Sequence, residues 1–148
     1  MNLEILRTKE ELRSLIDAYA ILGDEKRISE QMNLFTPDAN YTVYMNGIEV
    51  ANTTGTDKLK EEFSGHASQV KTYFTLNGQH SIKIDKDTAA GVSFSQIKMV
   101  RENDGKDILT DYSVKYEDEY VHQNDKWLIK KRIGYFFIIE ARALNNPF

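Results

Sequence analysis

Apolar residues recur at helical spacing in the first part of the chain and alternate with polar residues further on. A first helix is predicted over residues 8–23, because its apolar side chains repeat every three or four positions: Leu12, Leu15, Ile16 and Tyr19. Thr8 and Glu11 fit a capping box at its start, and Gly23 suits the left-handed residue that ends many helices. The chain is therefore expected to open with one amphipathic helix.

Two shorter helices are predicted after the first. A helix over residues 25–34 would bury Ile28 and Met32, and a turn over residues 35–40 would follow, built around Pro37. Thr56 can cap a third helix that ends near Gly65, with Leu59 and Phe63 facing inward. His66 would then lie in an exposed loop.

The remaining segments predict strands. Asn46-Gly47 is the favoured sequence for a two-residue hairpin turn, here between strands 41–45 and 48–51. Four longer strands follow, separated by short polar turns, over residues 70–84, 88–101, 108–122 and 127–140. Strands this long twist and acquire bulges, and the candidate bend points are Gly78, Gly91 and Gly134.

Helices followed by a strand meander predict an α+β fold in one domain over residues 1–148. The expected architecture is a cone: a curved antiparallel, or mixed, sheet with three helices from the N-terminal half packed on its concave face. A cone of this kind has an open mouth, and concave apolar sites are where proteins bind small molecules.

Composition excludes several classes of function. The chain has no cysteine, which excludes disulfides, thiolate zinc sites and cysteine nucleophiles. Its net charge is −4 with interspersed signs, so nucleic acid is not expected as a partner. No apolar run reaches the length of a membrane span, and the N-terminus is charged, so a cytoplasmic protein without membrane contact is expected.

A series of motifs then gives a resemblance to a known family. The motifs are Tyr-Ala-Ile-Leu-Gly-Asp at 19–24, Leu-Phe-Thr-Pro-Asp-Ala at 34–39, Asp-Lys-Asp-Thr-Ala at 85–89, Tyr-Glu-Asp at 116–118 and Trp-Leu-Ile-Lys-Lys-Arg at 127–132. Together they resemble the SnoaL-like branch of the nuclear transport factor 2-like superfamily, which includes scytalone dehydratase and polyketide cyclases. The resemblance implies the fold, whereas activity varies within it.

The resemblance implies a role for Asp24, the aspartate that ends the first helix. In the family's dehydratases and cyclases this carboxylate projects into the cone and acts as an acid or base, often with a strand histidine. From the residues alone, Asp24 has two interpretations: a pocket carboxylate, or an N-cap of the second helix.

The strand histidine is where the chain departs from the family. The family's histidine position falls on Thr75, and Gln79 falls where asparagine is common. His80 is one residue further and would face the cone only if a bulge near Gly78 turned it inward. It is then an acid/base partner of Asp24, and otherwise a structural histidine. No histidine spacing indicates a metal site.

One strand carries a stripe of polar and aromatic side chains on a single face: Tyr112, Val114, Tyr116, Asp118, Tyr120 and His122. These tyrosines either pack in the core or line a pocket. Asp118 is expected to pair with Arg132 or Lys130, since an unpaired buried carboxylate is costly. Ser93, Ser95 and Gln96 are candidates for inward polar groups.

Two functions of different classes remain open. In the first, a cofactor-independent dehydratase, isomerase or cyclase acts on a small cyclic carbonyl or hydroxyl compound, with Asp24, His80 and Tyr116 as catalytic residues. Its substrate-binding candidates are Tyr19, Tyr44, Phe74, Gln79, Gln96 and Tyr112. In the second, the same cone is a non-catalytic binding or interaction module. Neither calls for a metal or cofactor.

The apolar segment 135–144 carries hydrophobic groups on both faces. Either it folds over the mouth of the cone or another chain covers it. The resemblance to the family, whose sheets often pair back to back, implies a homodimer.

Overall fold

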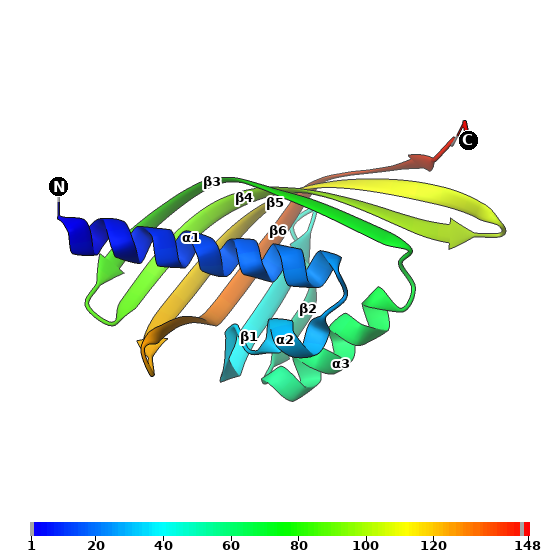
Figure 1. Ribbon diagram of the computed structural model, residues 1–148. Helices are drawn as coiled ribbons and strands as arrows, with labels where there is room; N and C mark the ends of the chain where they lie inside the picture. Colours follow the sequence, from blue (N-terminus) through cyan, green and yellow to red (C-terminus); the bar gives the residue numbers. More distant parts are fainter. Residues whose placement is uncertain (1, 146) are drawn as a thin grey trace.

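A six-stranded sheet with helices on one face makes up the chain in the computed structural model, which describes residues 2–145 and 147–148 (Figure 1). The helices are α1 (Leu3–Asp24), α2 (Ile28–Met32) and α3 (Thr56–Ala67). The strands are β1 (Phe35–Met45), β2 (Ile48–Thr54), β3 (Thr72–Asp85), β4 (Thr88–Asn103), β5 (Lys106–Gln123) and β6 (Lys126–Ala143). The predicted α+β class is confirmed.

The strand order is β2-β1-β6-β5-β4-β3, with β1 and β6 parallel and the other neighbours antiparallel. The sheet is therefore mixed and, as Figure 1 shows, curved, with all three helices on its concave side. Helix α1 crosses the sheet beside β3, α3 packs on β1 and β2, and α2 packs against α1 and α3. No helix among the described residues is long and apolar enough to cross a membrane.

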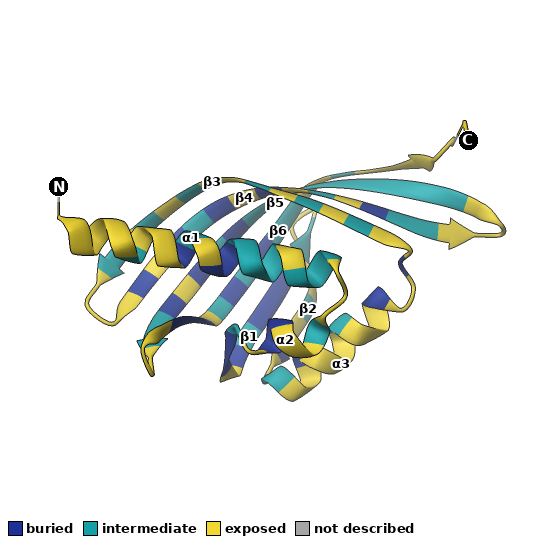
Figure 2. Cartoon of the chain, in the orientation of Figure 1, coloured by how far each residue is buried: buried dark blue, intermediate teal, exposed yellow. Residues whose placement is uncertain are grey.

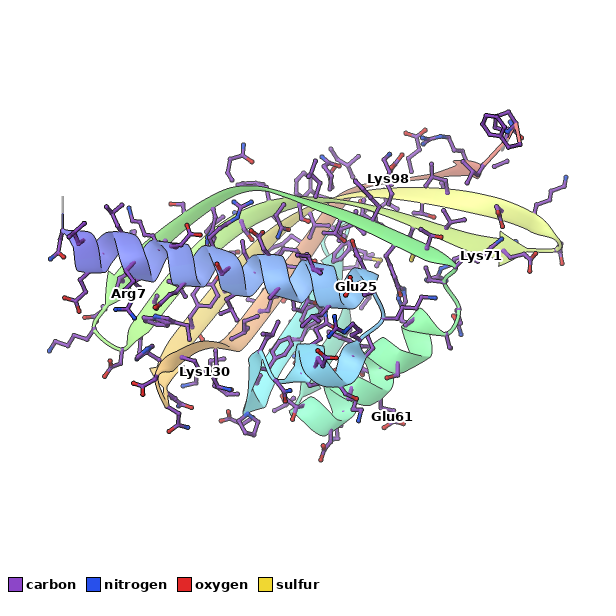
Figure 3. The ribbon with its side chains drawn as sticks, viewed as in Figure 1. Arg7, Glu25, Glu61, Lys71, Lys98 and Lys130 are labelled. Atoms are coloured by element: carbon purple, nitrogen blue, oxygen red, sulfur yellow. The ribbon has the colours of Figure 1, made fainter. Side chains whose placement is uncertain are left out.

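The core lies where α1 meets the sheet. Leu12 and Ile16 are fully buried on α1, and they pack with Leu59, Tyr120 and Ile129 from α3, β5 and β6. Figure 2 shows the buried band running under α1 and across the central strands, while the start of α1 is exposed. Charged side chains of both signs, such as the labelled Arg7, Glu61 and Lys98, lie around the outside in Figure 3.

Several predicted boundaries were wrong. Helix α1 begins at Leu3, capped by the Asn2 side chain, which accepts a hydrogen bond from Glu4 N at 2.8 Å, so Thr8 lies inside the helix. The helix continues through Gly23, and the left-handed residue is Lys26.

The later helices and the turn around Pro37 also differ from the prediction. Helix α2 has only 5 residues, and residues 35–40 belong to β1, where a register shift against β6 accommodates the proline. Helix α3 runs through Gly65 and includes His66. The turn at Asn46-Gly47 is confirmed, with φ of 51° and 80°.

The long strands contain the expected irregularities, but only one predicted bend point lies at a register shift. The β3–β4 register shifts between Asn77 and His80, as expected near Gly78. Gly91 and Gly134 lie in regular pairing, so there is no bulge at either glycine. A Cβ at Gly91 would lie 2.8 Å from the ring of Tyr120, so this glycine makes room for an aromatic side chain.

The segment 135–144 does not fold over the mouth. It continues β6, which pairs with β5 as far as Ile108 opposite Ala143. Phe137 and Ile138 remain 49% and 58% exposed, so the expectation of a covering second chain stays a prediction.

Candidate active site

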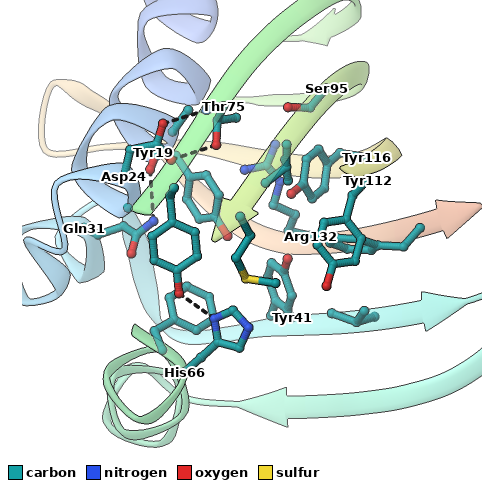
Figure 4. A pocket seen from close by; sticks show the side chains of 18 of the residues that line it. Tyr19, Asp24, Gln31, Tyr41, His66, Thr75, Ser95, Tyr112, Tyr116 and Arg132 are labelled. Carbon is teal, nitrogen blue, oxygen red and sulfur yellow. Dashed lines mark hydrogen bonds between the residues drawn. The ribbon is translucent and has the colours of Figure 1, made fainter. Parts of the chain in front are cut away.

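A cavity of about 380 Å³ lies between the concave face of the sheet and the ends of the helices (Figure 4). This volume lies within the roughly 300–1,000 Å³ usual for small-molecule sites. Its wall is mostly apolar, and its polar side chains include Asp24, Gln31, Thr75, Tyr116 and Arg132. The expected pocket beside Asp24 is therefore present.

Asp24 lines this cavity from the last residue of α1, and β3 holds both of its carboxylate oxygens. Oδ2 accepts a hydrogen bond from the Thr75 backbone N–H at 2.7 Å, and Oδ1 accepts one from Thr75 Oγ1 at 2.7 Å. The alternative reading of Asp24 as an N-cap was wrong, since α2 begins after Arg27 without a side-chain cap. Thr75, which occupies the family's histidine position, thus orients the Asp24 carboxylate.

Gln31 fixes the end of α1 from the opposite side. Its Nε2 donates a hydrogen bond to the Tyr19 carbonyl oxygen at 2.9 Å. A Cβ at Gly23 would lie 2.8 Å from this nitrogen, so the glycine allows the amide to approach the helix. Gln31 Oε1 is buried without a hydrogen-bond partner among the described residues, and Gln31 lines the cavity.

Arg132 is the charged group at the inner wall. It is 1% exposed, and its guanidinium carbon lies 4.2 Å from the ring centroid of Tyr19 and 3.6 Å from that of Tyr116. Its Nε lies 3.2 Å from Asp118 Oδ1, which confirms the expected ion pair. Within the described part of the chain, Nε has no partner besides Asp118, and Nη1 makes no hydrogen bond. A buried guanidinium with an unused donor at Nη1 favours an acceptor oxygen in the cavity.

Three phenols surround the guanidinium. Burial raises the pKa of Tyr19, Tyr41 and Tyr116 above the ordinary value for tyrosine, and neighbouring phenols add to the rise for Tyr19 and Tyr41. The Tyr41 side chain is in hydrogen-bonding contact with the other two. The three hydroxyls therefore stay protonated at neutral pH and serve as hydrogen-bond donors rather than bases.

His80 faces the helix side of the sheet but does not reach this cavity. The bulge near Gly78 turns its ring inward, and Nε2 lies 3.1 Å from the Tyr120 hydroxyl, which donates to Asp118 Oδ2 at 2.7 Å. Burial, followed by the charge of Arg13, lowers the pKa of His80 to about 4. The structure does not bring His80 and Asp24 together.

A different histidine lies at the cavity. His66 of α3 lines it, with Nδ1 2.5 Å from the Tyr73 hydroxyl and Nε2 2.8 Å from Arg101 Nη2. The sequence reading put His66 in a loop and missed it. Extending the apolar stripe of Leu59 and Phe63 by one turn would have found it on the inward face.

The remaining predicted residues divide by strand face. Tyr19, Tyr112 and Tyr116 line the cavity, as does Ser95. Four candidates do not line it, and their prediction as substrate contacts is corrected: Tyr44, Phe74, Gln79 and Gln96.

Strand alternation is the physical reason for these corrections. Tyr73 and Thr75 face inward, so Phe74 points outward and is 57% exposed. Tyr44 stacks on Tyr135 with ring centroids 5.3 Å apart, outside the cavity. Gln79 is exposed beside the bulge.

Comparison with known proteins identifies the family of the chain. The model of the SnoaL-like domain family matches residues 4–133. The chain belongs to the SnoaL-like domain family. Uncharacterized proteins of Mycobacterium tuberculosis and Mycobacterium bovis are 28% identical to this SnoaL-like chain over 125 residues, covering 83% of it and 81% of theirs.

Solved structures show the same fold. A protein of Novosphingobium aromaticivorans, provisionally assigned as a scytalone dehydratase, has a TM-score of 0.81 at 18% identity, covering 99% of the SnoaL-like chain and 97% of its own. A type 2 hexachlorocyclohexane dehydrochlorinase (LinA) has a TM-score of 0.81 at 15% identity, covering 99% of each.

A third similar structure is described by the name of its fold. An NTF2-like protein with a cystatin-like fold, also from Novosphingobium aromaticivorans, has a TM-score of 0.72 at 19% identity, covering 90% of the chain and 84% of its own. These structures confirm the expected fold of the chain.

Proposed function

We propose that the chain is a cofactor-independent lyase or isomerase that moves a proton on a small cyclic carbonyl compound. The observation that carries the proposal is Asp24, a carboxylate with both oxygens oriented by Thr75 at the wall of a mostly apolar cavity. Each carboxylate oxygen has a second lone pair, so the two hydrogen bonds leave acceptor sites free. Asp24 is the base that takes a proton from the carbon next to the carbonyl.

The inner wall supplies the complement to that base. Removing the proton creates negative charge on the carbonyl oxygen, and fixed donors aimed at such an oxygen stabilise the transition state. Arg132 Nη1 has no hydrogen-bond partner among the described residues, and Tyr19 and Tyr116 keep their protons. Proton transfer exchanges no electrons, so the proposal calls for no redox cofactor.

The structural relatives support a reaction of this kind. One is provisionally assigned as a scytalone dehydratase and another is named as a hexachlorocyclohexane dehydrochlorinase, and both names describe elimination reactions. They share the fold at under 20% identity, so the substrate of this chain rests on its own cavity.

The test is proton exchange in heavy water. Cyclohexanone and larger cyclic ketones are incubated with the protein, and loss of the α-proton signals is followed by NMR. Asp24→Asn is expected to lower the exchange rate by about 10²–10⁴, the usual contribution of a general base. Asp38→Asn, a matched change at an exposed carboxylate of β1, leaves it unchanged. Equal exchange in wild type and Asp24→Asn removes Asp24 from the mechanism.

A binding module is the second candidate, favoured by one observation. Asp24 contacts Thr75 where the family's catalytic pair has an imidazole. In that case the ketones bind, but wild type and Asp24→Asn give the same background exchange.

A further inference from the structure

A chain of three side chains lies at the cavity beside Asp24, and the catalytic proposal does not use it. Arg101 of β4, His66 of α3 and Tyr73 of β3 are joined in that order, at 2.8 Å and 2.5 Å. The imidazole and the phenol also face each other, with ring centroids 5.8 Å apart and planes 27° apart. Figure 4 shows the bond from His66 at the cavity wall.

The direction of each hydrogen bond follows from the donors available. A guanidinium only donates, so His66 Nε2 must accept from Arg101 Nη2. A neutral imidazole has one N–H, which must then be on Nδ1. Nδ1 therefore donates to the oxygen of Tyr73, and the chain leaves the hydroxyl hydrogen of Tyr73 unused.

The protonation states agree with this order. Burial, followed by the charge of Arg101, lowers the pKa of His66, so the ring is neutral at neutral pH. Burial raises the pKa of Tyr73 to about 12, so its proton stays in place. Among the described residues the Tyr73 hydroxyl makes no other hydrogen bond than the one with His66.

The unused hydroxyl hydrogen of Tyr73 is available to the cavity. Tyr73 and His66 both line it, and Tyr73 lies two residues before Thr75, on the same face of β3 that holds Asp24. The charge of Asp24 is close enough to contribute to the raised pKa of Tyr73. The hydroxyl and the carboxylate therefore lie on the same side of the cavity, whereas Arg132 belongs to its inner wall.

We propose that Tyr73 is a binding residue whose hydroxyl donates a hydrogen bond to a second acceptor oxygen of the ligand, with His66 and Arg101 as positioning residues. The inference rests on the proposed function and narrows its substrate class. The substrate therefore has two acceptor oxygens. One binds at the inner wall beside Arg132, and the other accepts a hydrogen bond from the Tyr73 hydroxyl.

Binding of two probes tests the subsite. Cyclohexanone has one carbonyl oxygen, and 1,4-cyclohexanedione has a second at the opposite end of the ring; NMR titration gives both Kd values. Tyr73→Phe is expected to weaken binding of the dione by about 3- to 10-fold, the usual worth of one neutral hydrogen bond, and to leave cyclohexanone unchanged. Tyr135→Phe, at a tyrosine that stacks on Tyr44 outside the cavity, leaves both unchanged. Equal effects of Tyr73→Phe on the two probes overturn the assignment.

The tautomer of His66 gives a readout without any ligand. Nitrogen-15 NMR of the wild type at neutral pH is expected to show a neutral ring protonated on Nδ1, and Arg101→Gln to weaken this preference. A ring protonated on Nε2 overturns the inference. These tests are separate from the test of the proposed function. If wild type and Asp24→Asn exchange protons equally, the proposed function fails, but the comparison of the two probes and the tautomer of His66 still decide the role of Tyr73.

Discussion

Replacing Asp118 with asparagine separates the charge of the buried ion pair from its hydrogen bond. The Arg132 and Asp118 side chains are 1% and 0% exposed. Asp118 Oδ2 also accepts the Tyr120 hydroxyl at 2.7 Å, and the carbonyl oxygen of an asparagine can take over that bond. Asp118→Asn therefore keeps shape and hydrogen bonding while leaving the Arg132 charge without its partner.

The expected loss of stability follows from this geometry. Removing one partner of a buried ion pair costs about 3–5 kcal/mol. The rings of Tyr19 and Tyr116, at 4.2 Å and 3.6 Å, still face the guanidinium and offset part of the charge. The lower end, about 3 kcal/mol, is therefore expected, which lowers Tm by roughly 6–12 °C in a domain of this size.

Urea unfolding followed by the fluorescence of Trp127, the only tryptophan, measures this loss. Asp111→Asn is the matched control on the same strand, since Asp111 pairs with Lys98 and Arg142 at 2.6 Å and 2.7 Å near the surface. Such pairs are worth about 0–1 kcal/mol. Equal losses in the two variants would refute the reasoning that the Arg132 charge depends on Asp118.

Three further predictions concern the packing, pH response and assembly of the chain. Gly91→Ala places a Cβ 2.8 Å from Tyr120 and is expected to cost about 1–3 kcal/mol in urea unfolding, whereas Gly65→Ala, with open space around it, does not destabilise; equal effects contradict this. The folded-state pKa of His80, about 4, lies below the ordinary 6.5, so unfolding takes up a proton and stability falls as pH drops from about 6.5 to 4. Thermal melts should show a smaller fall in His80→Gln, and parallel curves would refute this. The homodimer stays a prediction. Light scattering should give the mass of two chains for the wild type and of one chain for Leu76→Glu, a change at an exposed apolar side chain. A monomeric wild type excludes the dimer.

Local rules predicted those parts of the fold where neighbouring residues decide the conformation. The Asn46-Gly47 turn is confirmed because both residues accept positive φ at low cost. The stripe on β5 is confirmed because alternation places Tyr116 and Asp118 on one buried face, and a buried carboxylate needs a partner such as Arg132.

Tertiary context decided the parts that were missed. Residues 35–40 have the composition of a turn, yet they pair in β1, because a shift in register leaves the proline unpaired. Helix α1 starts at Leu3 because Asn2 supplies the cap. The capping-box pattern of Thr8 and Glu11 is the stronger signal in the sequence, and it led to a start that is too late.

In the candidate site, the face of the strand on which a side chain lies decides whether it reaches the cavity. Placing Thr75 inward on β3 would have excluded Phe74 and selected Tyr73. His80 was harder to place, since the bulge turns it inward as proposed, but at a position on the strand that meets Tyr120 instead of Asp24.

The central claim is that a small cyclic carbonyl compound binds in this cavity against Asp24. A crystal structure of the chain soaked with 1,4-cyclohexanedione tests it most directly. The account predicts the ring inside the cavity, with a carbon next to a carbonyl in contact with the Asp24 carboxylate. A cavity filled by its own side chains, or a dione bound away from Asp24, would contradict it.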